Sequence, residues 1–189
     1  MVPSVAECFQ RMDQYGMLDN IREHSCMVAR VAGLVGSRLV QAGQPVSIPL
    51  VVAGALLHDI AKTASLHKDL RHDAMGRDIC LRHGYLEIAE IVAEHVILKN
   101  GVPPDCCREK EIVYYADKRV RHEQVVSLEE RLEYILDRYG NRDNLLEETI
   151  RENFMMARQI EEIIFAQLDF TPDELPELVN GHPFVFAGQ

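Results

Sequence analysis

The sequence has no apolar run that reaches the ~20 residues needed to cross a bilayer. Residues 1–7 contain neither a basic segment nor an apolar one, so they do not form a secretory signal peptide. We therefore expect a cytoplasmic protein that has no membrane partner.

The cysteines form no pattern either. There are five of them, an odd number, and no Cys-x-x-Cys spacing occurs, which favours free thiols in a reducing compartment. Basic residues are outnumbered, 20 against 30 acidic residues, which gives a net charge of −10. Duplex nucleic acid and anionic membranes both select a basic surface, so neither is expected as the main partner.

Strand-like alternation, internal repeats and low-complexity segments are also missing from the 189 residues. The length fits one domain, or one domain with an appendage. Apolar residues recur with the helical period, which predicts an all-α protein. Asn20, Ser47 and Ser127 are expected as N-caps, and residues 62–71 as a polar loop. Helices are expected near residues 3–15, 20–42, 47–57, 72–83, 86–97, 109–122, 127–140, 144–168 and from 171 onward.

The most informative stretch is residues 54–62, where a wholly apolar helix ends in His58 and Asp59 and Lys62 follows three residues later. A neutral imidazole beside an ionised carboxylate suits a divalent cation such as Fe, Mn, Zn or Mg. Adjacent side chains on a helix point about 100° apart, so both reach one ion only near a helix end or where the helix unwinds. The same pair could also simply cap the helix. The choice between a metal site and a cap depends on residues elsewhere in the chain.

Two further residues bear on that choice. His24 lies in the first turn of the helix expected at residues 20–42. Asp117 lies beside the apolar face of the helix expected at residues 109–122. A carboxylate at such a position has to be paired or metal-bound, because an unpaired buried charge is costly.

The order His24, then His58 and Asp59, then Asp117, together with the sequence Leu-Leu-His-Asp-Ile-Ala-Lys at residues 56–62, resembles the HD-domain metal-dependent phosphohydrolases. The branch that carries His-Asp-Ile-Gly-Lys (HDIG) is the most similar. The resemblance covers residues 20–125 and includes two further matches, His72 and His95. It implies an HD-type helical bundle over residues 1–126, with residues 127–189 as a C-terminal helical extension packed on it.

The resemblance also implies roles for individual residues. One divalent metal, which could be Fe, Mn, Ni, Co, Zn or Mg, would be bound by His24, His58, Asp59 and Asp117. Lys62 would contact the substrate phosphate, and Lys62 and Asp59 would be the catalytic pair. His72 and His95 would hold phosphate oxygens or ligate a second metal. From the residues themselves, Arg121 is expected to attract the anion, because it belongs to a local basic cluster.

The sequence departs from the family pattern at two positions. Ala61 replaces the glycine of the HDIG motif, which is a mild change. Val96 stands where many members have a second histidine after His95, so a single metal, or a weakly bound second one, is predicted. The Gly-Tyr-Pro signature of cyclic-di-GMP phosphodiesterases is not seen.

The resulting hypothesis is hydrolysis of a phosphate ester by attack of a metal-bound water, with a nucleotide as the favoured small phosphorylated substrate. Two alternatives stay open. One is a non-catalytic nucleotide-binding signalling module, and the other is a diiron oxygenase of the same fold. Residues 127–189 carry no recognisable chemistry; they could cover the site, pack as an extra layer or form the seam of a homodimer.

Overall fold

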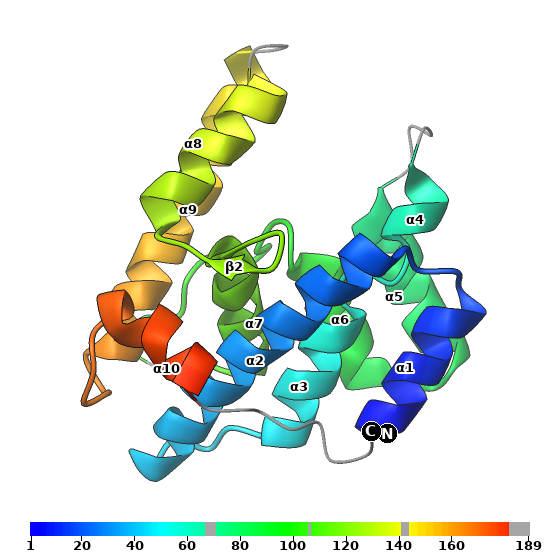
Figure 1. Ribbon diagram of the computed structural model, residues 1–189, viewed down its shortest axis with the longest axis horizontal. Helices are drawn as coiled ribbons and strands as arrows, with labels where there is room; N and C mark the ends of the chain where they lie inside the picture. The colour runs from blue at the N-terminus through cyan, green and yellow to red at the C-terminus, as the bar shows by residue number, and fades with distance from the viewer. Residues whose placement is uncertain (67–70, 106, 141–143, 182–189) are drawn as a thin grey trace.

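The computed structural model describes residues 1–66, 71–105, 107–140 and 144–181. Helices dominate these residues, as Figure 1 shows, and the predicted all-α fold is confirmed. The helices, in chain order, are α1 (Val5–Gln14), α2 (Asp19–Gln41), α3 (Ile48–Leu57), α4 (Lys62–Ser65), α5 (His72–Arg82), α6 (Leu86–Glu94), α7 (Glu109–Lys118), α8 (Leu128–Tyr139), α9 (Asn144–Phe165), the 3-10 turn η2 (Pro172–Glu174) and α10 (Leu175–Gly181).

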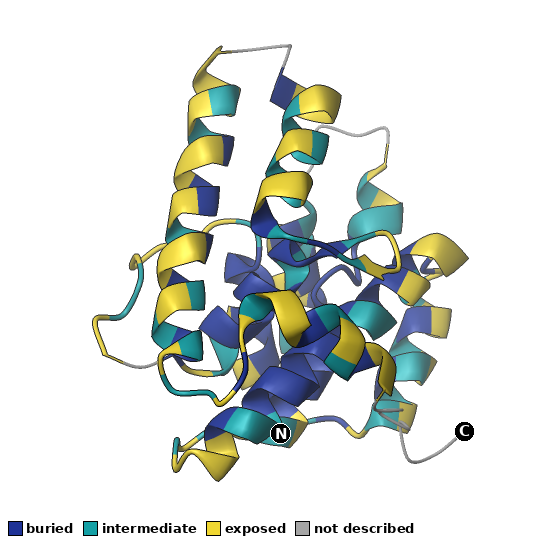
Figure 2. Ribbon diagram, turned by 60° about the vertical axis from the view of Figure 1, so that its left-hand side comes forward, coloured by how far each residue is buried: buried dark blue, intermediate teal, exposed yellow. Residues whose placement is uncertain are grey.

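Helix α3 forms the centre of the molecule. It is apolar on every side, and each residue from Leu50 to Leu57 is buried. Such a helix has to be surrounded, and α2, α6, α7 and α1 pack around it. Figure 2 shows buried residues concentrated in the interior of the molecule. The stretch Ile48–Ser65 is apolar enough to pass a length-and-composition test for a membrane span, but 67% of it is buried inside the protein, as in the core helix of a soluble domain.

Two glycines bring the helices of the core close together. A Cβ on Gly54 of α3 would lie 2.8 Å from Ile91 Cδ1 of α6. A Cβ on Gly76 of α5 would lie 2.7 Å from Val92 Cγ1 of α6. A larger residue at either position would therefore force these side chains of α6 to move. The two glycines let α3 and α5 pack closely against α6.

Two of the predicted N-caps need correction. Helix α2 begins at Asp19, so Asn20 lies inside the helix and Leu18 occupies the N-cap position. Thr63 Oγ1 accepts a hydrogen bond of 3.0 Å from the Leu18 N–H, and this tertiary contact replaces a local cap. Ser47 does precede α3, but its side chain makes no capping hydrogen bond. The prediction for Ser127 is correct, since it forms a full capping box with Glu130 at the start of α8.

The segment after α3 is more ordered than the loop predicted for residues 62–71. Four of its residues form the short helix α4, because the chain turns at residues 58–61 and then resumes helical hydrogen bonding, with the Ser65 N–H donating to the Ala61 carbonyl at 3.1 Å. Residues 67–70 lie outside the described part of the chain.

A small antiparallel hairpin, β1 (Val120–Arg121) and β2 (Gln124–Val125), was not predicted. It ends α7 earlier than the expected residue 122. His122 in its turn has φ 56°, a conformation that short hairpins require and that non-glycine residues adopt at some cost. The hairpin carries the chain from α7 to α8.

Helices α8 and α9 lie side by side and extend beyond the core (Figure 1). The lower part of α9 packs on α7, where the Tyr114 hydroxyl donates to the Asn153 carbonyl at 2.8 Å. Arg119, after α7, forms a buried ion pair of 2.8 Å with Glu161 of α9. The extension thus contacts the helices of the core, while the domain limit placed at residues 126 and 127 stays a prediction.

Candidate metal centre

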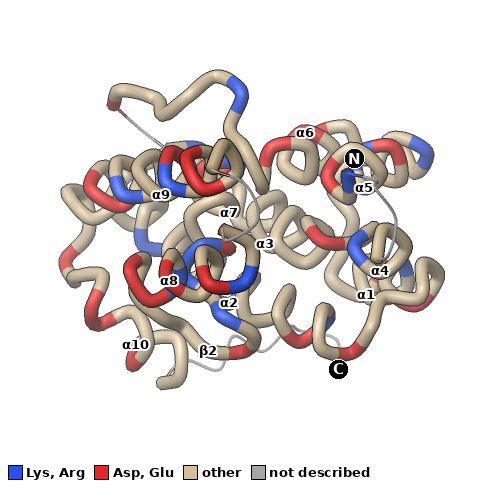
Figure 3. Tube along the Cα trace, turned by 90° about the horizontal axis from the view of Figure 1, so that it is seen from above, with Lys and Arg blue, Asp and Glu red and all other residues tan. Residues whose placement is uncertain are grey.

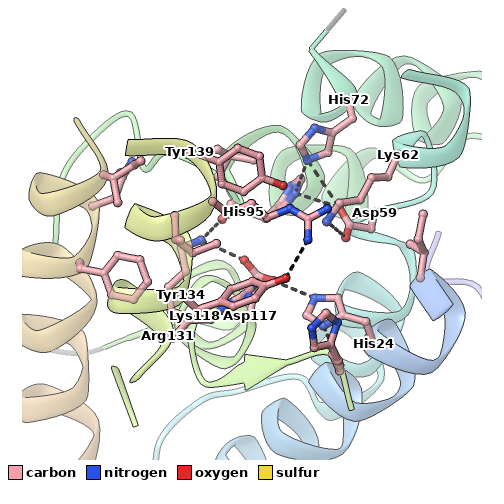
Figure 4. Close-up of a pocket in the computed structure, with 18 of the residues that line it drawn as sticks. His24, Asp59, Lys62, His72, His95, Asp117, Lys118, Arg131, Tyr134 and Tyr139 are labelled. Carbon is pink, nitrogen blue, oxygen red and sulfur yellow. Dashed lines mark hydrogen bonds and ion pairs between the residues drawn. The ribbon is translucent and has the colours of Figure 1, made fainter. Parts of the chain in front are cut away.

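The six histidine and aspartate residues singled out in the sequence lie together (Figure 4). Each comes from near a helix end or from the turn after one. His58 and Asp59 follow α3, His72 begins α5, and His95 follows α6. The remaining two, from the start of α2 and the end of α7, are His24 and Asp117. Helix ends bring polar side chains together while the apolar helix bodies stay packed.

A first set of donor atoms surrounds His58. His58 Nε2 lies 3.4 Å from Asp59 Oδ2 and 3.6 Å from Asp117 Oδ1. Asp117 Oδ1 also lies 3.1 Å from His24 Nε2. Donor atoms of His24, His58 and Asp59 all lie within 4.8 Å of one another. Two imidazoles and two carboxylates so arranged can hold a divalent cation.

A second set uses the other oxygen of the same carboxylate. Asp59 Oδ1 lies 3.4 Å from His72 Nε2 and 3.5 Å from His95 Nε2, and the two imidazole nitrogens are 3.2 Å apart. Donor atoms of this trio also lie within 4.8 Å of one another. Asp59 therefore stands between two ligand sets, and the second has fewer protein donors than the first.

The rings are oriented by backbone carbonyls. His58 Nδ1 donates to the Ala55 carbonyl at 2.7 Å, and His95 Nδ1 donates to the Val92 carbonyl at 2.7 Å. His24 Nδ1 donates to the His122 carbonyl at 3.1 Å. A carbonyl can only accept, so these bonds place the proton on Nδ1 and leave the Nε2 lone pair facing the cluster. Metal-binding histidines are held in the same way.

A metal fits this donor set for a further reason. His58 Nε2 and Asp59 Oδ1 are buried and have no hydrogen-bond partner, although buried polar atoms are normally satisfied. Burial lowers the pKa of His72 to about 4 and also lowers that of His95, so both rings are neutral at pH 7. Burial tends to raise the pKa of Asp59, but Lys62 and His58 outweigh it and hold that pKa well below its usual range. For His58, burial tends to lower the pKa, but Asp59 and Asp117 outweigh it and raise the pKa. The neutral rings of His72 and His95 and the ionised Asp59 are in the protonation states that metal binding requires.

Two lysines accompany the carboxylates. Lys62 Nζ donates to Asp59 Oδ2 at 2.6 Å. Lys118 Nζ lies 3.0 Å from Asp117 Oδ2 and donates to the His95 carbonyl at 2.6 Å. Burial lowers the pKa of Lys118, although Asp117 opposes this effect. Lys62 is the more accessible of the two, with 39% of its side chain exposed.

The cluster opens into a cavity of about 450 Å³. Covering the site was one of the alternatives left open for residues 127–189, but none of these residues was predicted individually. One wall of the cavity comes from α8 and α9. Its residues are Arg131, Tyr134, Ile135, Arg138, Tyr139, Leu146, Ile150, Asn153 and Phe154. Arg121, predicted to bind substrate, does not line this cavity. It borders a separate surface hollow beside Glu123 and Glu130.

Comparison with known proteins agrees with this geometry. The family model described as HD domain matches residues 21–142. A tRNA (cytidine(56)-2'-O)-methyltransferase of Thermoplasma volcanium is 30% identical over 145 residues, which are 67% of this chain and 41% of that protein. Ribonuclease Y of Treponema denticola is 31% identical over 99 residues, which are 52% of this chain and 18% of that protein. The chain thus spans less than half the length of either relative. No solved structure matches it at a significant level.

This chain belongs to the HD domain family, as the resemblance at residues 20–125 predicted. Members of the family bind divalent metals and are generally hydrolases, and the buried cluster around Asp59 could hold such a metal. The finer HDIG assignment, the identity of the metal and the role of each residue stay predictions.

Proposed function

We propose that this protein hydrolyses a phosphate ester of a small nucleotide, using one or two divalent metal ions held by the cluster. The observation that carries the proposal is the position of Asp59, whose two oxygens face two separate ligand sets. Both sets border a cavity that also contains Lys62. A carboxylate shared in this way is typical of sites that act on phosphate esters through metal ions about 3.5–4 Å apart.

The first set comprises His24, His58, Asp59 and Asp117, and the second comprises Asp59, His72 and His95. A bound divalent cation would screen the charge of the phosphate and lower the pKa of a coordinated water. The second set has only three donors and shares one of them, so we expect it to bind its ion more weakly. This agrees with the prediction drawn from Val96.

The protein's own side chains contribute positioning and charge. Asp59 is ionised at neutral pH, so it accepts hydrogen bonds and can orient the attacking water. Lys62 borders the cavity with a compact positive charge, which attracts the phosphate and stabilises negative charge as it grows on the phosphoryl oxygens. Neither role requires a conformational change in the core, because helix ends hold both residues.

We infer the class of phosphate ester from the name of one relative. The name ribonuclease, carried by the Treponema denticola protein, denotes cleavage of phosphodiesters in RNA. For this chain we propose a phosphodiester or phosphomonoester of a nucleotide. The net charge of −10 makes duplex nucleic acid the less favourable substrate.

The test is a screen of nucleotide mono- and diesters with Mn, Fe, Co, Ni and Mg on the purified protein, in air and under anaerobic conditions. We expect hydrolysis that depends on the metal and not on O₂. Turnover that requires O₂ would replace the proposal with the oxygenase alternative. Tight nucleotide binding without hydrolysis under any metal would replace it with the binding-module alternative.

A further inference from the structure

The cavity has two unlike halves. The first contains the histidines, the carboxylates and Lys62. In the second, α8 supplies Tyr134, Ile135 and Tyr139 and α9 supplies Leu146, Ile150 and Phe154, all bordering the same cavity. A phosphate group needs only the first half, so the second half is free to hold the rest of a substrate.

The charges of the cavity are not balanced. Lys62 is paired with Asp59, and Lys118 is paired with Asp117. Arg131 borders the same cavity, but no ion pair joins it to an acidic residue within the described part of the chain, and its Nε is buried without a hydrogen-bond partner. A guanidinium that borders a cavity and has an N–H without a partner can donate to phosphate oxygens.

The ring of Tyr134 lies beside this guanidinium. Arg131 Cζ is 5.5 Å from the centroid of the Tyr134 ring. The Tyr134 hydroxyl is held by a hydrogen bond of 3.0 Å from Arg138 Nη1, which fixes the orientation of the ring. Figure 4 shows Tyr134 and Tyr139 facing the cluster from the side of α8. Aromatic rings in a cavity that also contains a cation without an acidic partner among the described residues suit a substrate in which a flat ring is joined to an anionic group.

We propose that α8 and α9 form a recognition subsite, in which Arg131 binds the phosphate and Tyr134, Tyr139 and Phe154 hold a planar ring of the same substrate. This inference rests on the proposed function and assigns the binding of the substrate's base, or of another aromatic ring in its place, to the wall formed by α8 and α9. It also gives α8 and α9 a role in substrate recognition, which their sequence alone does not indicate.

The test compares esters with and without a ring, in the presence of Mn²⁺. One pair is adenosine 5'-monophosphate and ribose 5-phosphate, and the other is bis(4-nitrophenyl) phosphate and dimethyl phosphate. Affinity is measured as Kd by calorimetry for an ester that is not hydrolysed, and as kcat/KM for one that is. We expect the ring-bearing member of at least one pair to be preferred by ~10-fold or more, on the scale of one stacking contact.

Three variants assign the residues. Tyr134→Leu should reduce the ring preference to near unity while affecting the ring-free ester little. Arg131→Gln should lower the affinity, or kcat/KM, for both esters of a pair equally, by ~10-fold, as expected for the loss of a hydrogen bond to a charged group. Arg151→Gln is the matched control, because Arg151 lies on the exposed face of α9 and pairs with Glu147. If Tyr134→Leu fails to fold, Tyr139→Leu replaces it, since Tyr139 is 44% exposed.

Equal affinity for both members of each pair, or no binding of any of the four, would overturn the subsite. An unchanged ring preference in the tyrosine variants would do the same, and wild-type binding by Arg131→Gln would remove the role of that residue. These results are separate from the proposed function. A protein that prefers ring-bearing esters but hydrolyses none keeps the subsite and loses the phosphohydrolase assignment.

Discussion

The metal centre and the α8–α9 arm border the same cavity but are built in opposite ways. In the centre, His58, Asp59 and His95 are almost fully buried and come from helix ends. In the arm, the cavity residues come from the faces of two amphipathic helices, and of the residues of α8 only Leu128 is buried. Figure 3 shows acidic and basic residues interspersed along α8 and α9, as expected for helices with a solvated side. The proposed chemistry therefore lies on the buried part of the molecule, and the proposed recognition subsite lies on the more exposed part.

The largest effect is expected when Asp59, which both ligand sets share, is replaced. Because its two oxygens face both ligand sets, Asp59→Ala should lose all bound metal and reduce hydrolysis to background. His72→Ala should lose only the more weakly bound second ion. Elemental analysis of the purified variants, before and after dialysis against Mn²⁺, measures both effects.

Thermal unfolding is the control for these variants, since metal loss has to be separated from loss of the fold. Asp59→Ala that retains the metal content of the wild-type protein would contradict the assignment of the centre. The same metal content in His72→Ala and wild type would mean that His72 binds phosphate rather than a second ion.

The junction between the two regions is the next target. Arg119 pairs with Glu161 of α9 and donates to the Val126 and Pro172 carbonyls, and only 3% of its side chain is exposed. Arg119→Ala removes this donor from the two carbonyls, while Glu161 keeps the hydrogen bond of 2.6 Å from the Tyr115 hydroxyl. The substitution should lower the free energy of unfolding by about 2–4 kcal/mol, roughly 1–2 kcal/mol for each carbonyl left without a partner. Arg151→Ala removes only an exposed pair with Glu147 and should cost less than ~1 kcal/mol.

Urea unfolding of Arg119→Ala and Arg151→Ala measures the difference between the two pairs. Equal stability of the two variants would mean that the ion pair to Glu161 does not hold α9 on the core. The arm would then have to be held by its apolar contacts alone.

Lys62 tests how far the centre depends on charge. Lys62→Ala should keep the metal and the fold but lower turnover by ~10²-fold, on the scale of losing one stabilising donor. Lys62→Arg should recover little if a compact charge is needed, because a guanidinium has a different shape. Metal content measured beside the hydrolysis rate distinguishes this role from metal binding. Full turnover in Lys62→Ala would mean that Arg131, rather than Lys62, contacts the phosphate.

The resemblance to the HD-domain family predicted which histidines and aspartates lie together, and the chemistry of His58 and Asp59 supported that prediction. Only a few residue types bind divalent cations, and burying His58 and Asp59 at the end of an apolar helix is costly unless the pair has a partner. The residues of the cavity wall formed by α8 and α9 show no sequence pattern that indicates a binding site. Arg131, Tyr134 and Arg138 recur at a spacing of three and four residues, which is also what a solvated helix face shows. Only the packing of α8 beside α9 turns that face toward the centre.

The hairpin was not predicted, and Arg121 does not line the cavity as expected. The two outcomes have related causes. Each strand has two residues, too few for alternation to appear, and the turn at His122 lacks the Asn-Gly or Gly that usually marks such hairpins. Without the hairpin, Arg121 seemed to continue the helix of Asp117. In the structure the chain has already turned away, so Arg121 reaches a different hollow.

The smallest effect is expected at Ala61, where the sequence departs from the HDIG motif. Ala61 has φ −99° and ψ 0°, a conformation open to any L-residue, so the backbone needs no glycine there. Its methyl group is fully buried and would lie 3.9 Å from a Cβ on Gly76, so it fills space between the end of α3 and α5. Ala61→Gly should therefore lower the free energy of unfolding by ~1 kcal/mol, from the lost methyl contacts and the added freedom of the unfolded chain. Metal content and hydrolysis should stay within about twofold of wild type, a free-energy change well below the 1.36 kcal/mol that a tenfold change in rate represents. A large gain in turnover in Ala61→Gly would show instead that the alanine restrains Asp59, and that the rigidity of the centre limits its chemistry.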